Sequence, residues 1–88
     1  MREMDFDTFA GMLAERLRLA PGGPLRPATG LFDDLGVDSL QAFELLLIIE
    51  TAVGLDVPPA ELPELWTLGD AYAYYLTARS LAADAARA

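Results

Sequence analysis

The sequence contains no cysteine and no histidine, and all six of its cationic side chains are arginine. The absence of cysteine excludes a disulfide framework, a thiolate nucleophile and a zinc–thiolate site. The absence of histidine removes the usual general base, and the absence of lysine removes a Schiff-base or P-loop lysine. We therefore expect any reactive group that works on this chain to be supplied from outside it.

Positive charge is scarce, because 14 acidic side chains outnumber 6 basic ones and give a net charge of -8. This balance argues against nucleic acid and anionic membranes as partners, and it favours proteins with basic surfaces. The first residues show no signal-peptide pattern, and the apolar run Leu45–Ile49 is too short to span a bilayer. These features predict a cytoplasmic protein.

The length and hydrophobic content predict one compact domain over 1–88. With 88 residues and 53% hydrophobic side chains, the chain is too apolar for a disordered acidic tail. Its ends, residues 1–4 and about 81–88, are where fraying is expected, and the alternative for 81–88 is that these residues prolong the last helix. We expect a monomer with no metal site, and we interpret Asp33 and Asp34 as solvated loop residues.

The first helix is predicted from about Asp5 to Leu19, because apolar residues recur there with helical spacing. A connection with three prolines and four glycines follows over 21–37. Loops of this length tend to be functional or disordered, and we interpret this one as an ordered crossing between two helices. Three apolar side chains are expected to anchor it on the core: Leu31, Phe32 and Leu35.

The second helix is predicted from Asp38 or Ser39 to near Gly54, since Asp and Ser favour helix starts and Gly favours helix ends. Projection at about 100° per residue gives two apolar faces. The core face contains Ala42, Leu45, Ile49, Ala52 and Val53, with Leu46 and Ile48 at its edges. The opposite face contains Leu40, Phe43 and Leu47, mixed with Glu44 and Glu50.

The last helix is predicted to open at Thr67, with Asp70 placed for a capping box. Its buried stripe is expected to comprise Leu68, Ala71, Tyr72, Tyr75 and Leu76. Between 58 and 65 the prolines allow one short helical turn. Trp66 is expected to be buried between that turn and the last helix, and the alternative is that it makes an exposed contact. The predicted fold is therefore all-α, with three main helices, one short helix and a long first loop.

The stretch Leu35-Gly36-Val37-Asp38-Ser39-Leu40 resembles the attachment motif of acyl carrier proteins. Phe32 before it, Glu44 after it and the segment 67–71 extend the resemblance over most of the chain. The resemblance implies that Ser39 carries covalent 4′-phosphopantetheine, with Asp38 and Gly36 supporting the motif. It implies as partners a phosphopantetheinyl transferase and acyltransferases, ketosynthases or acyl or aminoacyl ligases.

The residues themselves agree with a carrier role for Ser39. A helix N-terminus offers unpaired N–H groups and the positive end of the dipole to a phosphodiester. Gly36 permits a tight backbone path beside it. Because the chain has no histidine or lysine to activate Ser39, a hydrolase is excluded, and the serine is a substrate of another enzyme. The structural alternative is that Ser39 only caps the helix.

The second apolar face of the 39–53 helix is a candidate partner surface. We expect Leu40, Phe43, Glu44, Leu47 and Glu50 to contact enzymes with basic docking surfaces. The alternative is that Leu40, Phe43 and Leu47 pack under the long loop as core.

Departures from the family pattern bear on the pathway. Gln41, Thr51 and Ala52 stand where fatty-acid carriers are often acidic, and Pro63 interrupts the short helix, which favours a discrete carrier of polyketide or other antibiotic biosynthesis. Val37 replaces a glycine typical of peptidyl carriers, which favours acyl cargo. An aminoacyl or peptidyl carrier and a helical adaptor without a prosthetic group remain the alternatives.

Overall fold

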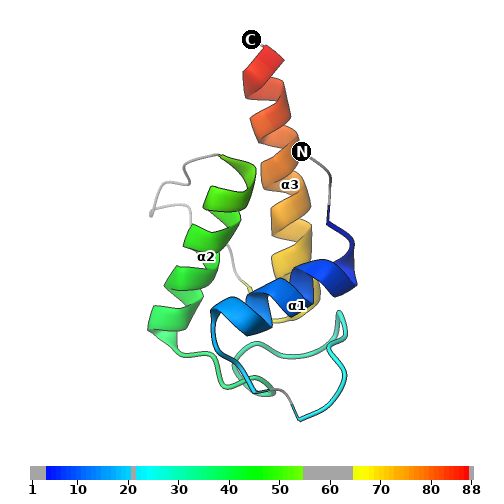
Figure 1. Cartoon of the computed structure of the whole chain (residues 1–88), viewed down its shortest axis with the longest axis vertical. Helices are drawn as coiled ribbons and strands as arrows, with labels where there is room; N and C mark the ends of the chain where they lie inside the picture. Colours follow the sequence, from blue (N-terminus) through cyan, green and yellow to red (C-terminus); the bar gives the residue numbers. More distant parts are fainter. Residues whose placement is uncertain (1–3, 21, 55–64, 88) are drawn as a thin grey trace.

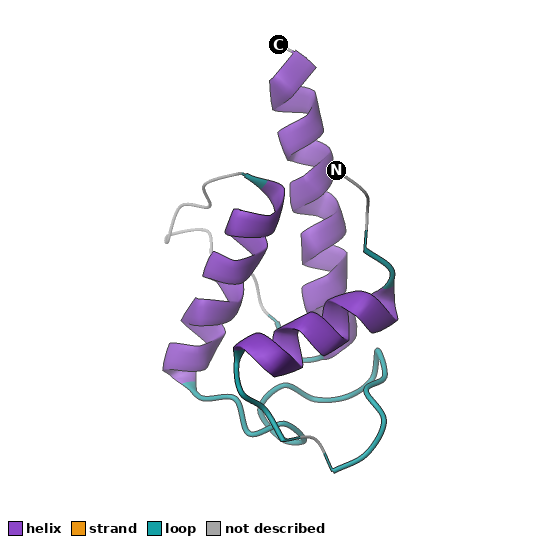
Figure 2. Ribbon diagram, viewed as in Figure 1, coloured by secondary structure: helices purple, strands orange, loops and turns teal. Residues whose placement is uncertain are grey.

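Three helices make up the regular structure of the part of the chain that the structure describes. The computed structural model describes residues 4–20, 22–54 and 65–87. In this part of the chain the helices are α1 (Phe6–Arg16), α2 (Ser39–Val53) and α3 (Leu68–Arg87), and no strand is present (Figure 1, Figure 2). The all-α prediction is confirmed, whereas the expected short helical turn lies almost wholly in 55–64, outside the described residues.

The long helix α3 holds the bundle together. It contacts both α1 and α2. In Figure 1, α2 and α3 run side by side, α1 crosses near their lower ends, and the loop between α1 and α2 lies beneath. The last turns of α3 extend beyond the end of α2. The start of α2 therefore faces the loop end of the molecule, far from the C-terminal end of α3.

The core is built from one face of each helix and from three residues outside the helices, Leu17, Leu31 and Val37. Phe9 stacks on Tyr75 with ring centroids 5.2 Å apart. Leu31 and Val37 bring the loop into the same core. The buried side chains of the helices are Phe9, Ala10 and Leu13 in α1, Leu45, Leu46 and Ile49 in α2, and Leu68, Ala71, Tyr75 and Ala78 in α3. The centres of the predicted stripes are thus confirmed, whereas five of the residues predicted to be buried are only half-buried: Ala42, Ala52, Val53, Tyr72 and Leu76.

Each helix start is capped by a side chain that favours helix starts: Asp5 at α1, Asp38 at α2 and Thr67 at α3. Asp5 accepts a hydrogen bond from the N–H of Thr8 at the start of α1. At α3, the Thr67 hydroxyl accepts from the N–H of Asp70, and the Asp70 carboxylate accepts from the N–H of Thr67. The capping box expected at Thr67 is therefore present.

The first helix ends at Arg16, three residues before the predicted boundary. The reason is a turn in which Arg18 takes a positive φ of 56°. The N–H of Leu17 still bonds to Leu13, while that of Leu19 reaches the carbonyl of Ala14. A left-handed residue closes the helix end and redirects the chain into the loop.

Two tyrosines of α3 fix Met4, the residue just before the Asp5 cap of α1. The Tyr75 hydroxyl accepts from the N–H of Met4 at 3.0 Å, and the Tyr72 hydroxyl donates to the carbonyl of Met4 at 2.8 Å. Both polar backbone groups of Met4 are thereby satisfied by one helix, so α1 is entered from a fixed point.

The long loop is ordered by hydrogen bonds to the start of α3. Gly30 and Thr67 form an isolated antiparallel bridge. The N–H of Leu68 donates to the carbonyl of Thr29, and that of Gly69 donates to the carbonyl of Pro27, both at 2.9 Å. The described part of the loop thus runs against the first turn of α3, as expected for an ordered crossing.

Two aromatic residues of this region are not buried as expected. Trp66 is 64% exposed and Phe32 is 40% exposed, so the predicted burial of Trp66 and the predicted core anchoring by Phe32 are wrong. In an extended segment neighbouring side chains point to opposite sides, and Leu65 is the one that packs on the core. Leu31 fills the core position beneath the loop, which leaves Phe32 outside.

Candidate functional site: the start of helix α2

Ser39 is the first helical residue of α2 and is exposed. The residue that caps the helix is Asp38, whose carboxylate accepts from the N–H of Gln41 at 2.8 Å. The Gln41 side chain in turn accepts from the N–H of Asp38 at 3.1 Å, which completes a capping box. The alternative in which Ser39 serves as the helix cap is therefore wrong, and its hydroxyl is released from that role.

The backbone just before Ser39 is held by the core. Val37 is buried, and its N–H donates to the carbonyl of Leu31 at 2.9 Å. Gly36 has φ of 67°, a left-handed conformation that glycine adopts without strain. The tight path expected at Gly36 is confirmed. A buried residue and a sharp turn thus place Ser39 at the surface on a rigid support.

Gln41 also ties α2 to α1. Its side-chain nitrogen donates to the carbonyl of Leu17, just past the end of α1, over 3.2 Å. A carboxylate at this position could complete the capping box but could not donate to a carbonyl. The absence of an acid here, noted above only as a departure from the family pattern, has a structural reason.

The end of α2 that carries Ser39 fits a phosphodiester. The cap satisfies the N–H of Gln41, which leaves the N–H groups of Ser39 and Leu40 pointing out of the helix end. No acidic side chain lies in the first turn of α2 itself. Unpaired N–H groups and the positive dipole end favour an anion beside the serine.

The same end of α2 cannot activate the serine. The chain has no histidine or lysine, and the described residues contain no group of three side chains able to hold a metal ion. The Asp38 carboxylate is engaged in the cap. The chain therefore has neither a histidine nor a lysine that could activate the Ser39 hydroxyl.

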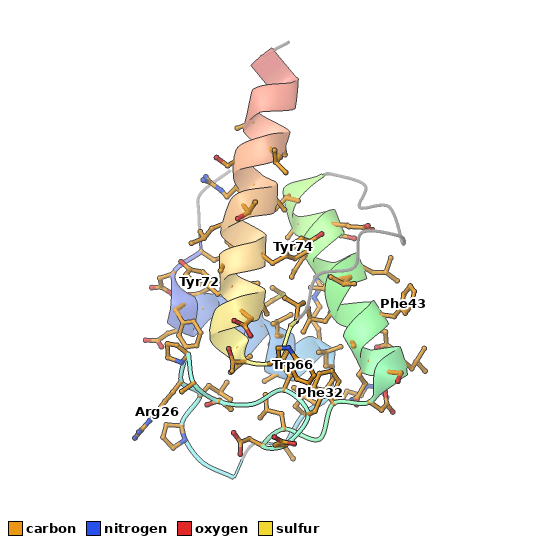
Figure 3. All side chains as sticks on the ribbon, turned by 180° about the vertical axis from the view of Figure 1, so that it is seen from behind. Arg26, Phe32, Phe43, Trp66, Tyr72 and Tyr74 are labelled. Carbon is orange, nitrogen blue, oxygen red and sulfur yellow. The ribbon has the colours of Figure 1, made fainter. Side chains whose placement is uncertain are left out.

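The second apolar face of α2 is exposed. Leu40, Phe43 and Leu47 are 68%, 49% and 55% exposed, so the alternative in which they pack under the loop is wrong. Phe43 projects from the outer side of α2 in Figure 3. Glu44 between them is exposed, whereas Glu50 is half-buried and takes part in a further interaction. The candidate contact residues thus share one side of the helix that begins at Ser39.

Two carboxyl groups with lowered pKa values lie at other helix starts. Hydrogen bonds from Thr8 lower the pKa of Asp5. The backbone N–H groups of Trp66 and Thr67 lower the pKa of Asp70, and both bonds end on its Oδ2. These shifts stabilise the fold and are not part of the Ser39 site.

Sequence reasoning missed two features around the site. The bond from Gln41 to Leu17 joins residues 24 positions apart, so no local pattern signals it. The second feature is an edge-to-face contact between Phe32 and Trp66, whose ring centroids lie 6.0 Å apart. The only signal for it was a pair of large aromatic residues beside glycine and acidic residues.

Comparison with known proteins places the same stretch in a family. A sequence profile described as “Phosphopantetheine attachment site” matches residues 7–75. An acyl carrier protein of Campylobacter hominis is 29% identical over 69 residues, covering 78% of this chain and 86% of that protein. An acyl carrier protein of Wolinella succinogenes is 29% identical over 72 residues, covering 82% of this chain and 93% of that protein. Among the described residues, no helix is both long and apolar enough to cross a membrane.

Proposed function

The chain belongs to the phosphopantetheine-binding family of acyl carrier proteins, and we propose that Ser39 is the residue that bears its covalent 4′-phosphopantetheine. As a member of this family the chain is a carrier and not a catalyst. When attached, the group supplies the thiol that the sequence lacks, and that thiol holds acyl groups as thioesters. The observation that carries the proposal is an exposed serine at the first position of α2, freed from capping by Asp38.

The chain's own residues present the serine and do not perform the transfer. Gly36 and Val37 fix the backbone before Ser39, and Asp38 with Gln41 holds the first turn of α2. The free N–H groups at this end are placed to receive phosphate oxygens. A phosphopantetheinyl transferase would supply the base and the coenzyme A, and the serine oxygen would replace the leaving nucleotide on phosphorus.

Intact-protein mass spectrometry tests the attachment site. The wild-type chain, incubated with coenzyme A and a broad-specificity phosphopantetheinyl transferase, should gain the mass of one phosphopantetheine. The Ser39→Ala variant should show no gain in mass. Ser80→Ala is the control, because Ser80 is an exposed serine in the C-terminal half of α3. An unmodified wild type would favour the helical adaptor, and modification that persists in Ser39→Ala would move the site elsewhere.

We further propose that partner enzymes dock on the exposed face of α2, through Leu40, Phe43, Glu44, Leu47 and Glu50. Exposed apolar side chains beside acidic ones suit a partner surface that offers both arginines and apolar contacts. Replacing Glu44 by Arg should slow acyl transfer from a cognate enzyme, and Glu50→Arg should act in the same direction. Unchanged kinetics in both variants, with the fold retained, would reject this face.

The pathway proposed is polyketide or related antibiotic biosynthesis, with the chain acting as a discrete, monomeric, cytoplasmic carrier. Support comes from the sparse acidic residues of α2, where only Glu44 and Glu50 are charged. Loading assays separate acyl from aminoacyl use. The chain carrying phosphopantetheine should accept acyl groups from an acyltransferase of such a pathway. Loading by an aminoacyl ligase alone would favour the aminoacyl carrier.

A further inference from the structure

An aromatic pair stands outside the core beside the start of α3. Phe32 comes from the long loop and Trp66 from the segment before α3, and their rings meet edge to face at an interplanar angle of 68°. Figure 3 shows the two side chains together below the first turn of α3. Both are substantially exposed, at 40% and 64%. Two large aromatic rings left in water at one place are unusual on a small domain and typical of contact surfaces.

The pair forms one wall of a surface hollow with acidic residues. The hollow has a volume of about 300 Å³ and is lined by Phe32 and Trp66 together with Ala28, Gly30, Asp33, Asp34 and Thr67. Asp34 accepts a hydrogen bond from the N–H of Gly30. Asp33 is exposed and adds negative charge at the rim. Aromatic faces beside a carboxylate suit a cationic side chain, and above all a planar guanidinium.

Backbone hydrogen bonds connect the hollow to the segment that precedes Ser39. The carbonyl of Trp66 accepts from the N–H of Leu31 at 2.8 Å, and the carbonyl of Leu31 accepts from the N–H of Val37 at 2.9 Å. Val37 lies two residues before Ser39. Two backbone hydrogen bonds and two peptide units therefore separate the aromatic pair from the serine.

We propose that this hollow, which we name the Phe32–Trp66 patch, docks the phosphopantetheinyl transferase through an arginine side chain of that enzyme. The inference rests on the proposed function of Ser39. In enzymes that act on the thiol, the reacting atoms are separated from Ser39 by the length of the flexible group, even when the enzyme docks on α2. The transferase instead reacts at the Ser39 oxygen itself, so its footprint must cover the surface around the start of α2.

Charge and shape support this occupant. The net charge of -8 attracts a basic enzyme, and Asp33 focuses that attraction at the patch. A guanidinium over the exposed Trp66 ring gains a cation–π contact while the carboxylate of Asp33 lies nearby. The patch is separate from the exposed face of α2, so it would give the transferase a second point of contact.

Steady-state kinetics with the purified transferase and full-length chain tests the patch. In Trp66→Ala the backbone bonds of residue 66 to Leu31 and Asp70 are retained, because they involve main-chain atoms of residue 66. We expect KM for the carrier to rise about tenfold, the effect of losing an interface anchor worth roughly 1.4 kcal/mol, with kcat retained. Leu81→Ala is the control, since Leu81 is 54% exposed far along α3. Circular dichroism melts verify that both variants fold.

Two charge-reversal variants give the second arm of the test. Asp33→Arg and Asp7→Arg change the net charge equally, but Asp7 lies in the first turn of α1, away from the patch. We expect Asp33→Arg to raise KM several-fold more than Asp7→Arg at low salt, with the difference shrinking as salt rises. Equal KM values for the two variants would overturn the role of Asp33.

The chain's single tryptophan reports occupancy directly. Emission from Trp66 in the unmodified Ser39→Ala chain should shift when a tryptophan-free transferase is added, and the shift should weaken in Phe32→Ala. Wild-type modification with unchanged kinetics in Trp66→Ala would overturn the patch while leaving Ser39 as the attachment site. Emission that changes only on conversion to the phosphopantetheine form would assign the patch to the attached group and also overturn the proposal. A wild type that is never modified would instead defeat the proposed function.

Discussion

Asp38 and Gln41 hold each other across the first turn of α2, each side chain accepting the other's backbone N–H, at 2.8 and 3.1 Å. The same glutamine donates to Leu17 beyond the end of α1. One residue therefore fixes both the first turn of the helix that bears Ser39 and its attachment to the neighbouring helix. The Ser39 side chain takes no part in these three hydrogen bonds, which hold the helix end on which it lies.

Replacement of Gln41 separates these two functions. Gln41→Ala removes the reciprocal cap and the bond to Leu17, and we expect a loss of about 1–2 kcal/mol in the free energy of unfolding. Gln41→Glu keeps an acceptor for the N–H of Asp38 but cannot donate to Leu17, so it should fall between Ala and wild type. Urea unfolding measures both. A Gln41→Glu variant as stable as wild type would show that the bond to Leu17 contributes no more than an added carboxylate gains at the helix start.

Replacement of Asp38 distinguishes capping from a direct part in modification. Asparagine caps helices about as well as aspartate, so Asp38→Asn should keep nearly full stability, whereas Asp38→Ala should lose about 1 kcal/mol. If the carboxylate also takes a direct part in the reaction at Ser39, Asp38→Asn should still slow modification. Thermal melts and intact-mass time courses give the two readouts. Equal modification rates for Asp38→Asn and wild type would limit Asp38 to capping.

Two glycine-to-alanine changes should have opposite signs. A Cβ on Gly69 would lie 2.9 Å from the carbonyl oxygen of Pro27, in the contact that joins the loop to α3, so Gly69→Ala should destabilise by about 1–3 kcal/mol. A Cβ on Gly11, inside α1, meets nothing within 4 Å, so Gly11→Ala should stabilise by about 0.5–1 kcal/mol. Denaturant unfolding compares the pair. The same sign for both would contradict the close approach at Gly69.

Acid should weaken the junction between the loop and α3 through Asp70. The N–H groups of Trp66 and Thr67 lower the pKa of Asp70 below its ordinary value of 3.8. Because the folded pKa is the lower one, this carboxylate contributes stability above the unfolded pKa and loses it as pH falls below about 5 toward the folded pKa. The free energy of unfolding, measured from pH 6 down to pH 3, should fall more steeply in wild type than in Asp70→Asn. If the free energies of unfolding of the two proteins fell in parallel with pH, Asp70 would not contribute to the loss of stability in acid.

Two leucines two positions apart on α2 should differ in what they affect. Leu45 is 1% exposed, so Leu45→Ala should cost about 2–5 kcal/mol. Leu47 is 55% exposed, so Leu47→Ala should change stability by about 0.5 kcal/mol or less and instead reduce acyl transfer from a partner enzyme. Chemical unfolding and transfer kinetics measured on both variants test the assignment. A large stability loss in Leu47→Ala would place that side chain in the core.

Local sequence signals predicted the helix that carries the site. Asp38 and Gly54 mark the ends of α2 by capping chemistry that acts within a few residues, and the two-faced projection separated Leu45 from Leu47 correctly. The same reasoning overextended α1, because the left-handed turn at Arg18 has no glycine or asparagine to announce it.

Long-range contacts decided what the sequence could not. The exposure of Trp66 follows from its neighbour Leu65 packing on the core and from the backbone bond of Trp66 to Leu31. Hydrophobicity alone favours burial of tryptophan, so the prediction failed where main-chain pairing fixed the direction of the side chain. Gln41 illustrates the reverse, since a residue that looked like a departure from a pattern proved to be a tertiary donor.

The hydrogen bonds of Tyr72 and Tyr75 to the backbone of Met4 have a practical consequence for handling the protein. It fixes the entry to α1 against α3, while the C-terminal turns of α3 project at the top of the molecule in Figure 1. Ser39 begins α2 at the lower end. An affinity tag or surface tether joined through the end of α3 would therefore be attached at the end of the molecule opposite to Ser39, and the serine would stay accessible to enzymes.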